Sequence, residues 1–132
     1  MGGVPTRKGC MMPGFASLAM INLDATDPAA QASFYAGVLG WDVLHSQDEY
    51  AMIGDGSTSL GFGRVPGYSG PGWPQETAPK RYHLDFYVDD LDKAEQEALA
   101  LGASKPAGQP QPDRWRVLLD PEGHPFDLCV RS

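Results

Sequence analysis

An internal repeat constrains the fold of this chain more than any other feature of its sequence. Residues 82–88 alternate apolar and polar side chains and run into an acidic segment, and residues 20–28 are a weaker copy of the same pattern. In this alignment Asp27 matches Asp90, and each copy continues into a helical segment that closes on Leu-Gly. A chain of 132 residues suffices for one packed domain and is too short for two independent ones. We therefore expect one domain built from two related modules.

Hydrophobic periodicity and turn residues predict the same order of elements in both modules. In the first module we expect a strand over 17–25, a helix over 28–39, and strands over 41–46, 50–53 and 59–65. Asp27 and Pro28 form a typical helix start, and Gly40 is a typical stop. In the second module we expect a strand over 81–88, a helix over 91–101, a short strand near 103–105, and strands over 114–119 and 125–130. Each module is thus β-α-β-β-β, an α+β arrangement.

Proline and glycine set the expected domain boundaries. Residues 1–15 are rich in Gly, Pro and Met without periodicity, which predicts a flexible lead-in. Four prolines in residues 66–80 exclude a helix or a central strand, so this segment is the expected connector between module 1 (16–65) and module 2 (81–130) of a single domain, 16–130. The connector carries Trp73, which either belongs to a lid over a binding site or plugs the edge of the domain.

Charge and composition exclude several classes of partner. The net charge is -7 and the ten Lys and Arg residues are scattered, which argues against nucleic-acid binding. No apolar run approaches the roughly 20 residues that span a bilayer, and the first residues lack the apolar stretch of a signal peptide, so we expect a cytoplasmic protein without membrane contact. Cys10 and Cys129 are expected to be free thiols.

Strand alternation separates a core face from a polar face in both modules. In the first strand, alternation leaves three side chains opposite the helix: Met20, Asn22 and Asp24. In the second module the corresponding set is His83, Asp85, Tyr87, Asp127 and Cys129. His83 and Asp127 could form an acid–base pair in which the carboxylate orients the imidazole, or His83 could only line a polar pocket.

Other side chains suggest which ligands such a face would accept. Three neighbouring carboxyl groups, on Asp24, Asp85 and Asp127, would raise at least one pKa by like-charge repulsion, which suits a cationic ligand or a proton acceptor. Trp115 could stack on a flat ligand or fill the core. Arg116 could receive an anionic group or be a solvated edge charge.

Four segments of the chain have a family resemblance: residues 32–41 (ASFYAGVLGW), 83–92 (HLDFYVDDLD), 101–103 (LGA) and 119–128 (LDPEGHPFDL). They resemble the vicinal-oxygen-chelate superfamily, which includes glyoxalase I, extradiol dioxygenases and bleomycin-resistance proteins. The chain is most similar to the glyoxalase-like subgroup. The resemblance implies two tandem modules whose mixed sheet curls into a cup, with the helices outside and a ligand inside. It also implies a homodimer.

The resemblance implies a metal site with ligands from the first and last strand of each module. His83 and Asp127 occupy the second-module positions. The first-module positions fall on Met20 and, if Asp55-Gly56 is matched to Glu122-Gly123, on Leu60, or on Phe62 if the register slips by two. None of these three offers a hard donor, so we expect no tightly bound catalytic metal. Asn22 or Asp24 could complete a weak site for a divalent metal such as Zn, Ni, Mn or Fe.

These observations lead to two functional hypotheses. The first is a small-molecule binder of the bleomycin-resistance type, whose cup is lined by Met20, Asn22, Asp24, Leu60, Phe62, Trp73, Tyr87, Trp115, Arg116 and Cys129. The alternative is a lyase, isomerase or dioxygenase-type enzyme that uses His83 with Asp127 or Asp85, with or without a weakly held divalent metal.

Overall fold

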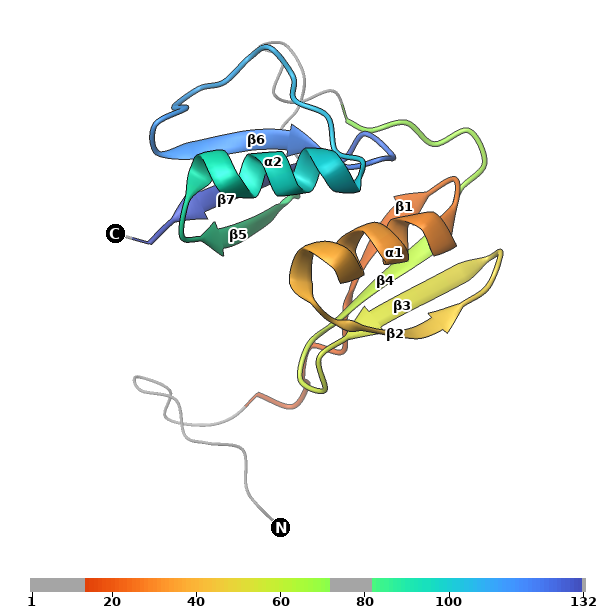
Figure 1. Ribbon diagram of the computed structural model, residues 1–132. Coiled ribbons are helices and arrows are strands. Elements are labelled where there is room, and N and C mark those ends of the chain that lie inside the picture. Colours follow the sequence, from red (N-terminus) through yellow and green to blue (C-terminus); the bar gives the residue numbers. More distant parts are fainter. Residues whose placement is uncertain (1–13, 72–81, 132) are drawn as a thin grey trace.

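Two helices and two sheets form the part of the chain that the computed structural model describes, residues 14–71 and 82–131 (Figure 1). The first module contains β1 (Ile21–Ala25), α1 (Pro28–Leu39), β2 (Asp42–Ser46), β3 (Tyr50–Gly54) and β4 (Ser59–Arg64). The second contains β5 (Leu84–Val88), α2 (Leu91–Leu101), β6 (Trp115–Leu119) and β7 (Pro125–Val130). This arrangement confirms the α+β class.

Both helices begin and end where the sequence predicts. The Asp27 carboxylate accepts a hydrogen bond from the backbone N–H of Ala30 at 3.2 Å, which caps α1. The Asp90 carboxylate caps α2 in the same way. Each helix ends at a glycine with a left-handed backbone, Gly40 at φ 71° and Gly102 at φ 117°. Neither helix is long and apolar enough to cross a membrane.

The two modules form separate sheets with the same internal arrangement. The four-stranded sheet has the order β1-β4-β3-β2, and the three-stranded sheet has the order β5-β7-β6. The first strand of each module pairs in parallel with the last, β1 with β4 and β5 with β7. The strands therefore bring the beginning and the end of each module side by side.

The second module has one strand fewer than expected. The segment predicted as a strand near 103–105 makes a single bridge, between Ser104 and Leu119. Pro106 follows directly and has no N–H to continue a ladder. The Gln109 side chain takes over at the next position, where it accepts from the Val117 N–H at 3.0 Å and donates to the Val117 carbonyl at 2.8 Å. A loop side chain thus replaces the missing strand.

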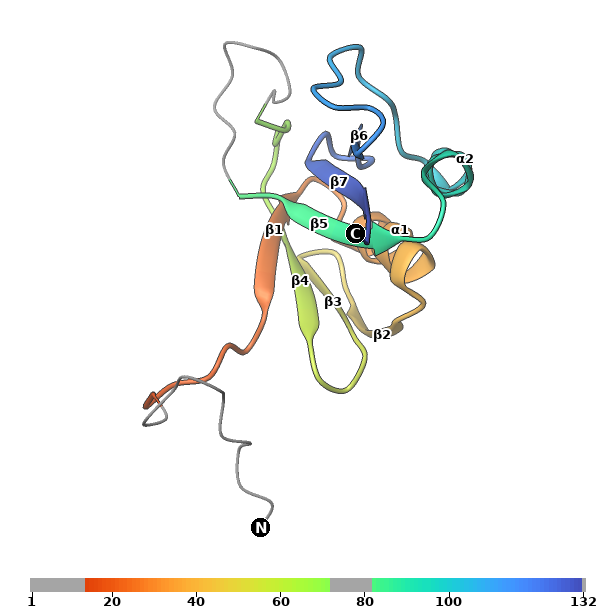
Figure 2. The same ribbon diagram turned by 90° about the vertical axis from the view of Figure 1, so that its left-hand side faces the viewer.

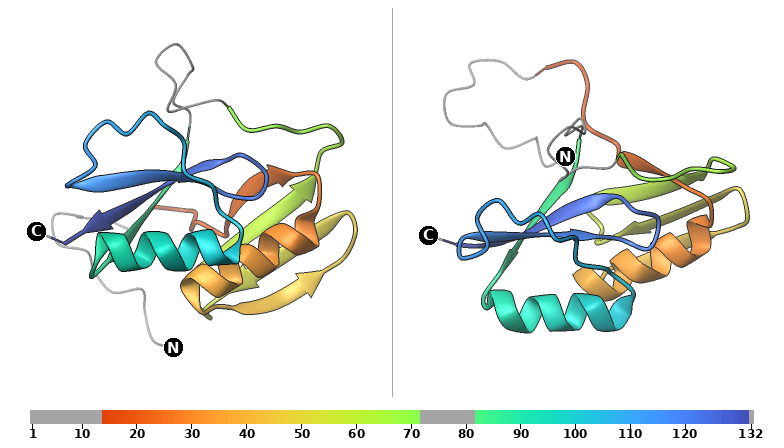
Figure 3. Two further views of the ribbon diagram at one scale, coloured as in Figure 1. Left: turned by 45° about the horizontal axis from the view of Figure 1, so that its top comes forward. Right: turned by 90° about the horizontal axis from the view of Figure 1, so that it is seen from above.

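Helix α1 joins the two sheets into one core. Both helices lie on the same side of the sheets (Figure 3, right), and Figure 2 views the molecule with β1 and β5 in front. Tyr35 of α1 stacks on Phe62 of β4, with the ring centroids 5.7 Å apart. Phe34, its neighbour, packs against Phe126 of β7 at 5.8 Å. The opposite side of each sheet is free of helices, and we call it the open face.

The turn between β6 and β7 fastens module 2 to module 1. The buried carboxylate of Asp120 accepts from the Tyr35 hydroxyl at 2.6 Å and from Gln31 Nε2 at 2.8 Å. Burial and the Asp120 charge raise the pKa of Tyr35 well above its ordinary value. The Glu122 carboxylate accepts from the Thr26 hydroxyl and from the Asp27 N–H at the start of α1. These bonds are intrachain, so the chain itself holds its modules together.

Candidate functional site

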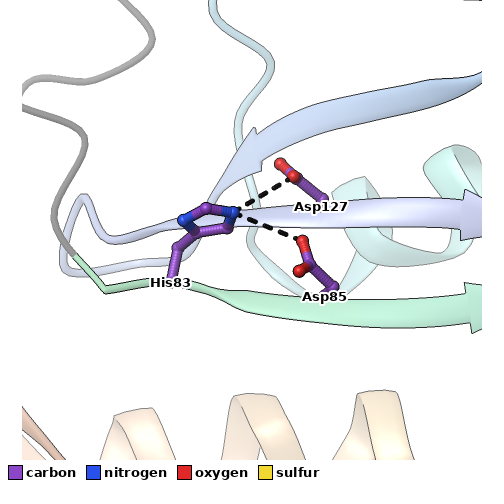
Figure 4. A group of neighbouring side chains, drawn as sticks. All are labelled: His83, Asp85 and Asp127. Carbon is purple, nitrogen blue, oxygen red and sulfur yellow. Dashed lines mark ion pairs between the residues drawn. The ribbon is translucent and has the colours of Figure 1, made fainter.

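A histidine and two aspartates converge on the open face of module 2. Nε2 of His83 lies 3.3 Å from Oδ1 of Asp85 and 3.3 Å from Oδ2 of Asp127 (Figure 4). The three side chains offer ligand atoms that all lie within 4.8 Å of one another. The side chains of His83 and Asp127 are 14% and 9% exposed, whereas that of Asp85 is 60% exposed. The group therefore has a buried end and an end that solvent or a ligand can reach.

Strand pairing explains why these three residues meet. Asp85 on β5 is in register with Asp127 on β7, so both side chains leave the sheet on the same face. His83 precedes Asp85 by two residues and shares its face. The sequence prediction that groups these side chains is correct.

A hollow surrounds the group, and we call it the aromatic hollow. Its volume is about 500 Å³, and it is lined by His83, Asp85, Phe86, Tyr87, Trp115, Asp127 and Cys129. Every one of these except Phe86 was a candidate from the sequence. None of these lining residues is a lysine or an arginine.

The pKa of Cys129 reflects its burial and the negative charge in this hollow. Burial raises the pKa of its thiol, and the charges of Asp85 and Asp127 raise it further. A negative charge is thus disfavoured at this position, because two carboxylates already lie nearby. The thiol is half-buried and holds its proton more firmly than an ordinary cysteine.

The open face of module 1 has different side chains at the matching positions. Gly61 on β4 is in register with Asn22 on β1, as Asp127 is with Asp85. The prediction that Leu60 or Phe62 matches Asp127 was therefore wrong. Both are buried in the core, on the side that the helices cover. Met20 contacts the Tyr50 hydroxyl through its sulfur at 3.2 Å.

Arg116 also differs from its predicted role as a ligand-binding residue. It lies on the helix side of β6, where its guanidinium pairs with Asp92 at 2.7 Å and Glu95 at 3.2 Å, both on α2. The hydrogen bond to Asp92 raises the pKa of Arg116. Trp73 lies outside the described residues.

A second hollow lies beside β1, and we call it the connector hollow. It has a volume of about 520 Å³ and is lined by Ile21, Asn22, Leu23, Asp24, Tyr68, Ser69, Pro71, Tyr82 and His124. Asp24 thus lies in this hollow and not with Asp85 and Asp127. The Tyr68 hydroxyl is 2.7 Å from Nε2 of His124, and their rings stack. Sequence reasoning missed this pair because its members lie 56 residues apart in a connector and a turn.

The side chains on the open faces can be compared with the ligands that a divalent metal site requires. One imidazole and two carboxylates come from module 2, while Met20 and Gly61 occupy the matching positions of module 1. The four-ligand set that the resemblance implies is therefore incomplete. His83, Asp85 and Asp127 suit a weakly held ion, which would act as a Lewis acid on a bound oxygen.

Sequence comparison places the chain among known relatives. Residues 20–129 match the family described as "Glyoxalase-like domain". The chain is 34% identical over 110 residues to the protein named "Putative glyoxylase CFP32" in Mycobacterium bovis and in Mycobacterium tuberculosis. The match covers 76% of this chain and 39% of that protein, so the chain spans about two fifths of the relative's length.

Solved structures share the fold at low sequence identity. A glyoxalase/bleomycin resistance protein/dioxygenase family enzyme from Burkholderia phytofirmans has a TM-score of 0.62 at 23% identity, over 87% of this chain and 98% of that one. The fosfomycin resistance protein FosX from Mesorhizobium loti gives 0.64 at 16%, over 90% and 95%. A bleomycin-binding protein complexed with bleomycin gives 0.53 at 19%, over 89% and 100%. The fold matches these proteins and the sequence matches the family over most of its length, so the chain belongs to the glyoxalase-like domain family.

Proposed function

We propose that the protein binds a small organic molecule in the aromatic hollow. The observation that carries the proposal is the composition of its wall, where the aromatic side chains of Tyr87 and Trp115 lie beside the group of His83, Asp85 and Asp127. Ligand sites combine apolar and aromatic surface with a few convergent polar groups in this way. A volume of about 500 Å³ lies within the range of small-molecule sites, roughly 300–1,000 Å³.

Two further observations favour binding over metal-assisted chemistry. The metal positions of module 1 hold Met20 and a glycine, so a closed four-ligand site cannot form from these residues. Among the structures of the same fold, one is a bleomycin-binding protein complexed with bleomycin. That likeness shows the fold alone, but it is consistent with a hollow that binds a ligand.

The proposal can be tested with a mixed library of aromatic fragments of different charge, screened by NMR on isotopically labelled protein. We expect the shifted resonances to cluster at residues 83–87, 115, 127 and 129. Trp115→Leu should weaken the hits at least about tenfold, because an aromatic wall is lost. Tyr82→Leu, in the connector hollow, is the matched control and should leave them unchanged. Hits that map to the connector hollow, or that survive Trp115→Leu, would contradict the proposal.

A second candidate function is a metal-assisted lyase reaction. Two observations favour it: the close approach of one imidazole and two carboxylates, and the relatives named as glyoxylases. In that case His83, Asp85 and Asp127 would hold the ion, and the neighbouring aromatic wall would orient the substrate. Calorimetric titration with Mn²⁺, Ni²⁺ and Zn²⁺ separates the two functions. Tight binding that His83→Ala abolishes would favour the lyase, and its absence would leave the binder.

We also propose that the chain forms a homodimer. Strands β1, β2 and β5 are edge strands, and unpaired edges are a common route to self-association. Every residue of β2 is exposed, including Val43 and Leu44. Light scattering on the full chain across a concentration series would test this, and a mass of one chain throughout would refute it.

A further inference from the structure

The charge balance of the aromatic hollow points to the class of ligand. The residues that line the hollow include the carboxylates of Asp85 and Asp127 and one imidazole, and none of them is a lysine or an arginine. Arg116, the nearby cation on β6, is turned toward α2 and held there by Asp92 and Glu95. An anionic ligand would therefore be repelled by the carboxylates of Asp85 and Asp127, whereas a cation would be attracted to them.

The aromatic side chains of the hollow indicate the shape of the ligand as well as its charge. The guanidinium carbon of Arg131 lies 4.3 Å from the centroid of the Tyr87 ring. That distance is within the range of a cation–π contact, so the face of Tyr87 already receives a planar cation from the chain itself. Arg131 follows Cys129 by two residues and shares its face of the sheet, the open face. The ring of Trp115, from the neighbouring strand, offers a second aromatic surface in the same hollow.

Resting on the proposed function, we infer that the ligand of the aromatic hollow is a planar organic cation, an amidinium or guanidinium carried on an aromatic framework. Its cationic group lies against the carboxylates of Asp85 and Asp127, where its N–H groups donate charge-assisted hydrogen bonds. Its flat framework packs on Tyr87 and Trp115. Arg131 competes with the ligand for the ring of Tyr87.

Three probes of nearly identical shape test the inference: benzamidine, benzamide and benzoate, which differ in charge. Binding is measured by calorimetry on the full chain in the presence of EDTA, so that no divalent metal occupies the carboxylates. We expect benzamidine to bind at least about tenfold more tightly than benzamide, and benzoate more weakly than both.

Matched variants locate the effect. Asp127→Asn and Asp85→Asn should each reduce the preference for benzamidine over benzamide, and Asp85, which is exposed, is the variant that keeps the test valid if the buried Asp127 is needed for folding. Asp24→Asn removes the same charge from the connector hollow and should change nothing. Arg131→Gln should tighten benzamidine binding about twofold to fivefold, because a competing cation is removed. Arg64→Gln, a remote cation on β4, is its control.

The outcomes separate this inference from the proposed function. Equal binding of all three probes to the aromatic hollow would leave a small-molecule site but overturn the cation inference. A preference that Asp24→Asn reduces as much as Asp85→Asn would also overturn it, because the selectivity would then come from overall charge. An unchanged affinity in Arg131→Gln would refute the competition by Arg131. Binding of none of the probes would count against both proposals.

Discussion

The two modules share one backbone arrangement and differ sharply on their open faces. In module 2 the paired strands present two carboxylates, a histidine and a thiol. In module 1 the strands that match them present Met20, Asn22, Gly61 and Gly63. Both sheets have the same parallel pairing of first and last strand, so the scaffold does not cause the difference. The comparison teaches that duplicated backbone geometry fixes where a site can form, while the side chains at a few register positions decide whether it does.

Removing the hydrogen bonds that link the two modules should have the largest effect on stability. Asp120→Ala should lower the free energy of unfolding by about 3–5 kcal/mol, because it leaves Gln31 and Tyr35 with buried donors and no carboxylate. Urea denaturation at equilibrium measures the change. Asp24→Ala, an exposed aspartate on β1, is the control and should stay within about 0.5 kcal/mol of the parent. A loss for Asp120→Ala below about 1 kcal/mol would show that the turn does not hold the modules together.

Substitutions on the open face of module 1 should have a smaller effect on stability. A Cβ at Gly61 would collide with the Asn22 side chain and approach the Met20 sulfur, whereas a Cβ at Gly63 would meet nothing within 4 Å. Gly61→Ala should therefore cost about 1–3 kcal/mol of unfolding free energy, and Gly63→Ala should cost none. Adding Asn22→Ala to Gly61→Ala should recover part of the loss, since the obstructing side chain is gone. Equal effects at the two glycines would mean that the face of module 1 is not closely packed.

The smallest expected effect is a change in the reactivity of the Cys129 thiol on the open face of module 2. Asp85→Asn removes one of the charges that raise the pKa of Cys129, so the pKa should fall and the thiolate fraction at pH 8 should rise. Alkylation of Cys129 by iodoacetamide should then accelerate about twofold to threefold, as followed by site-resolved mass spectrometry. Burial, the larger cause of the shift, remains in the variant, which limits the gain. Asp24→Asn should leave the rate unchanged, and an equal acceleration there would remove Asp85 as the cause.

Local signals made much of this fold predictable. The capping residues Asp27 and Asp90 and the glycines Gly40 and Gly102 set the helix bounds, because each acts within a few residues of the chain. Alternation along β5 and β7 likewise grouped His83, Asp85 and Asp127 on one face. These features depend on residues that are close together in the chain, so they can be predicted from a single sequence.

Two errors arose where partner strands decide the outcome. Asp127 is the fourth residue after Gly123, whereas its register counterpart Gly61 is the fifth after Gly56. That one-residue difference in turn length moved the predicted position onto Leu60, and a slip of one residue exchanges the two faces of a strand. Arg116 was misplaced because alternation separates the faces of β6 without revealing which one α2 covers.

The Gln109 side chain has a consequence for how copies of this chain could assemble. By bonding both backbone groups of Val117, and with Ser104 bonding those of Leu119, it leaves β6 no ladder to offer a neighbouring molecule at these positions. Extension of the three-stranded sheet by strand pairing at these positions is therefore blocked. Strand-to-strand association between copies is directed to the other edges, β1, β2 or β5.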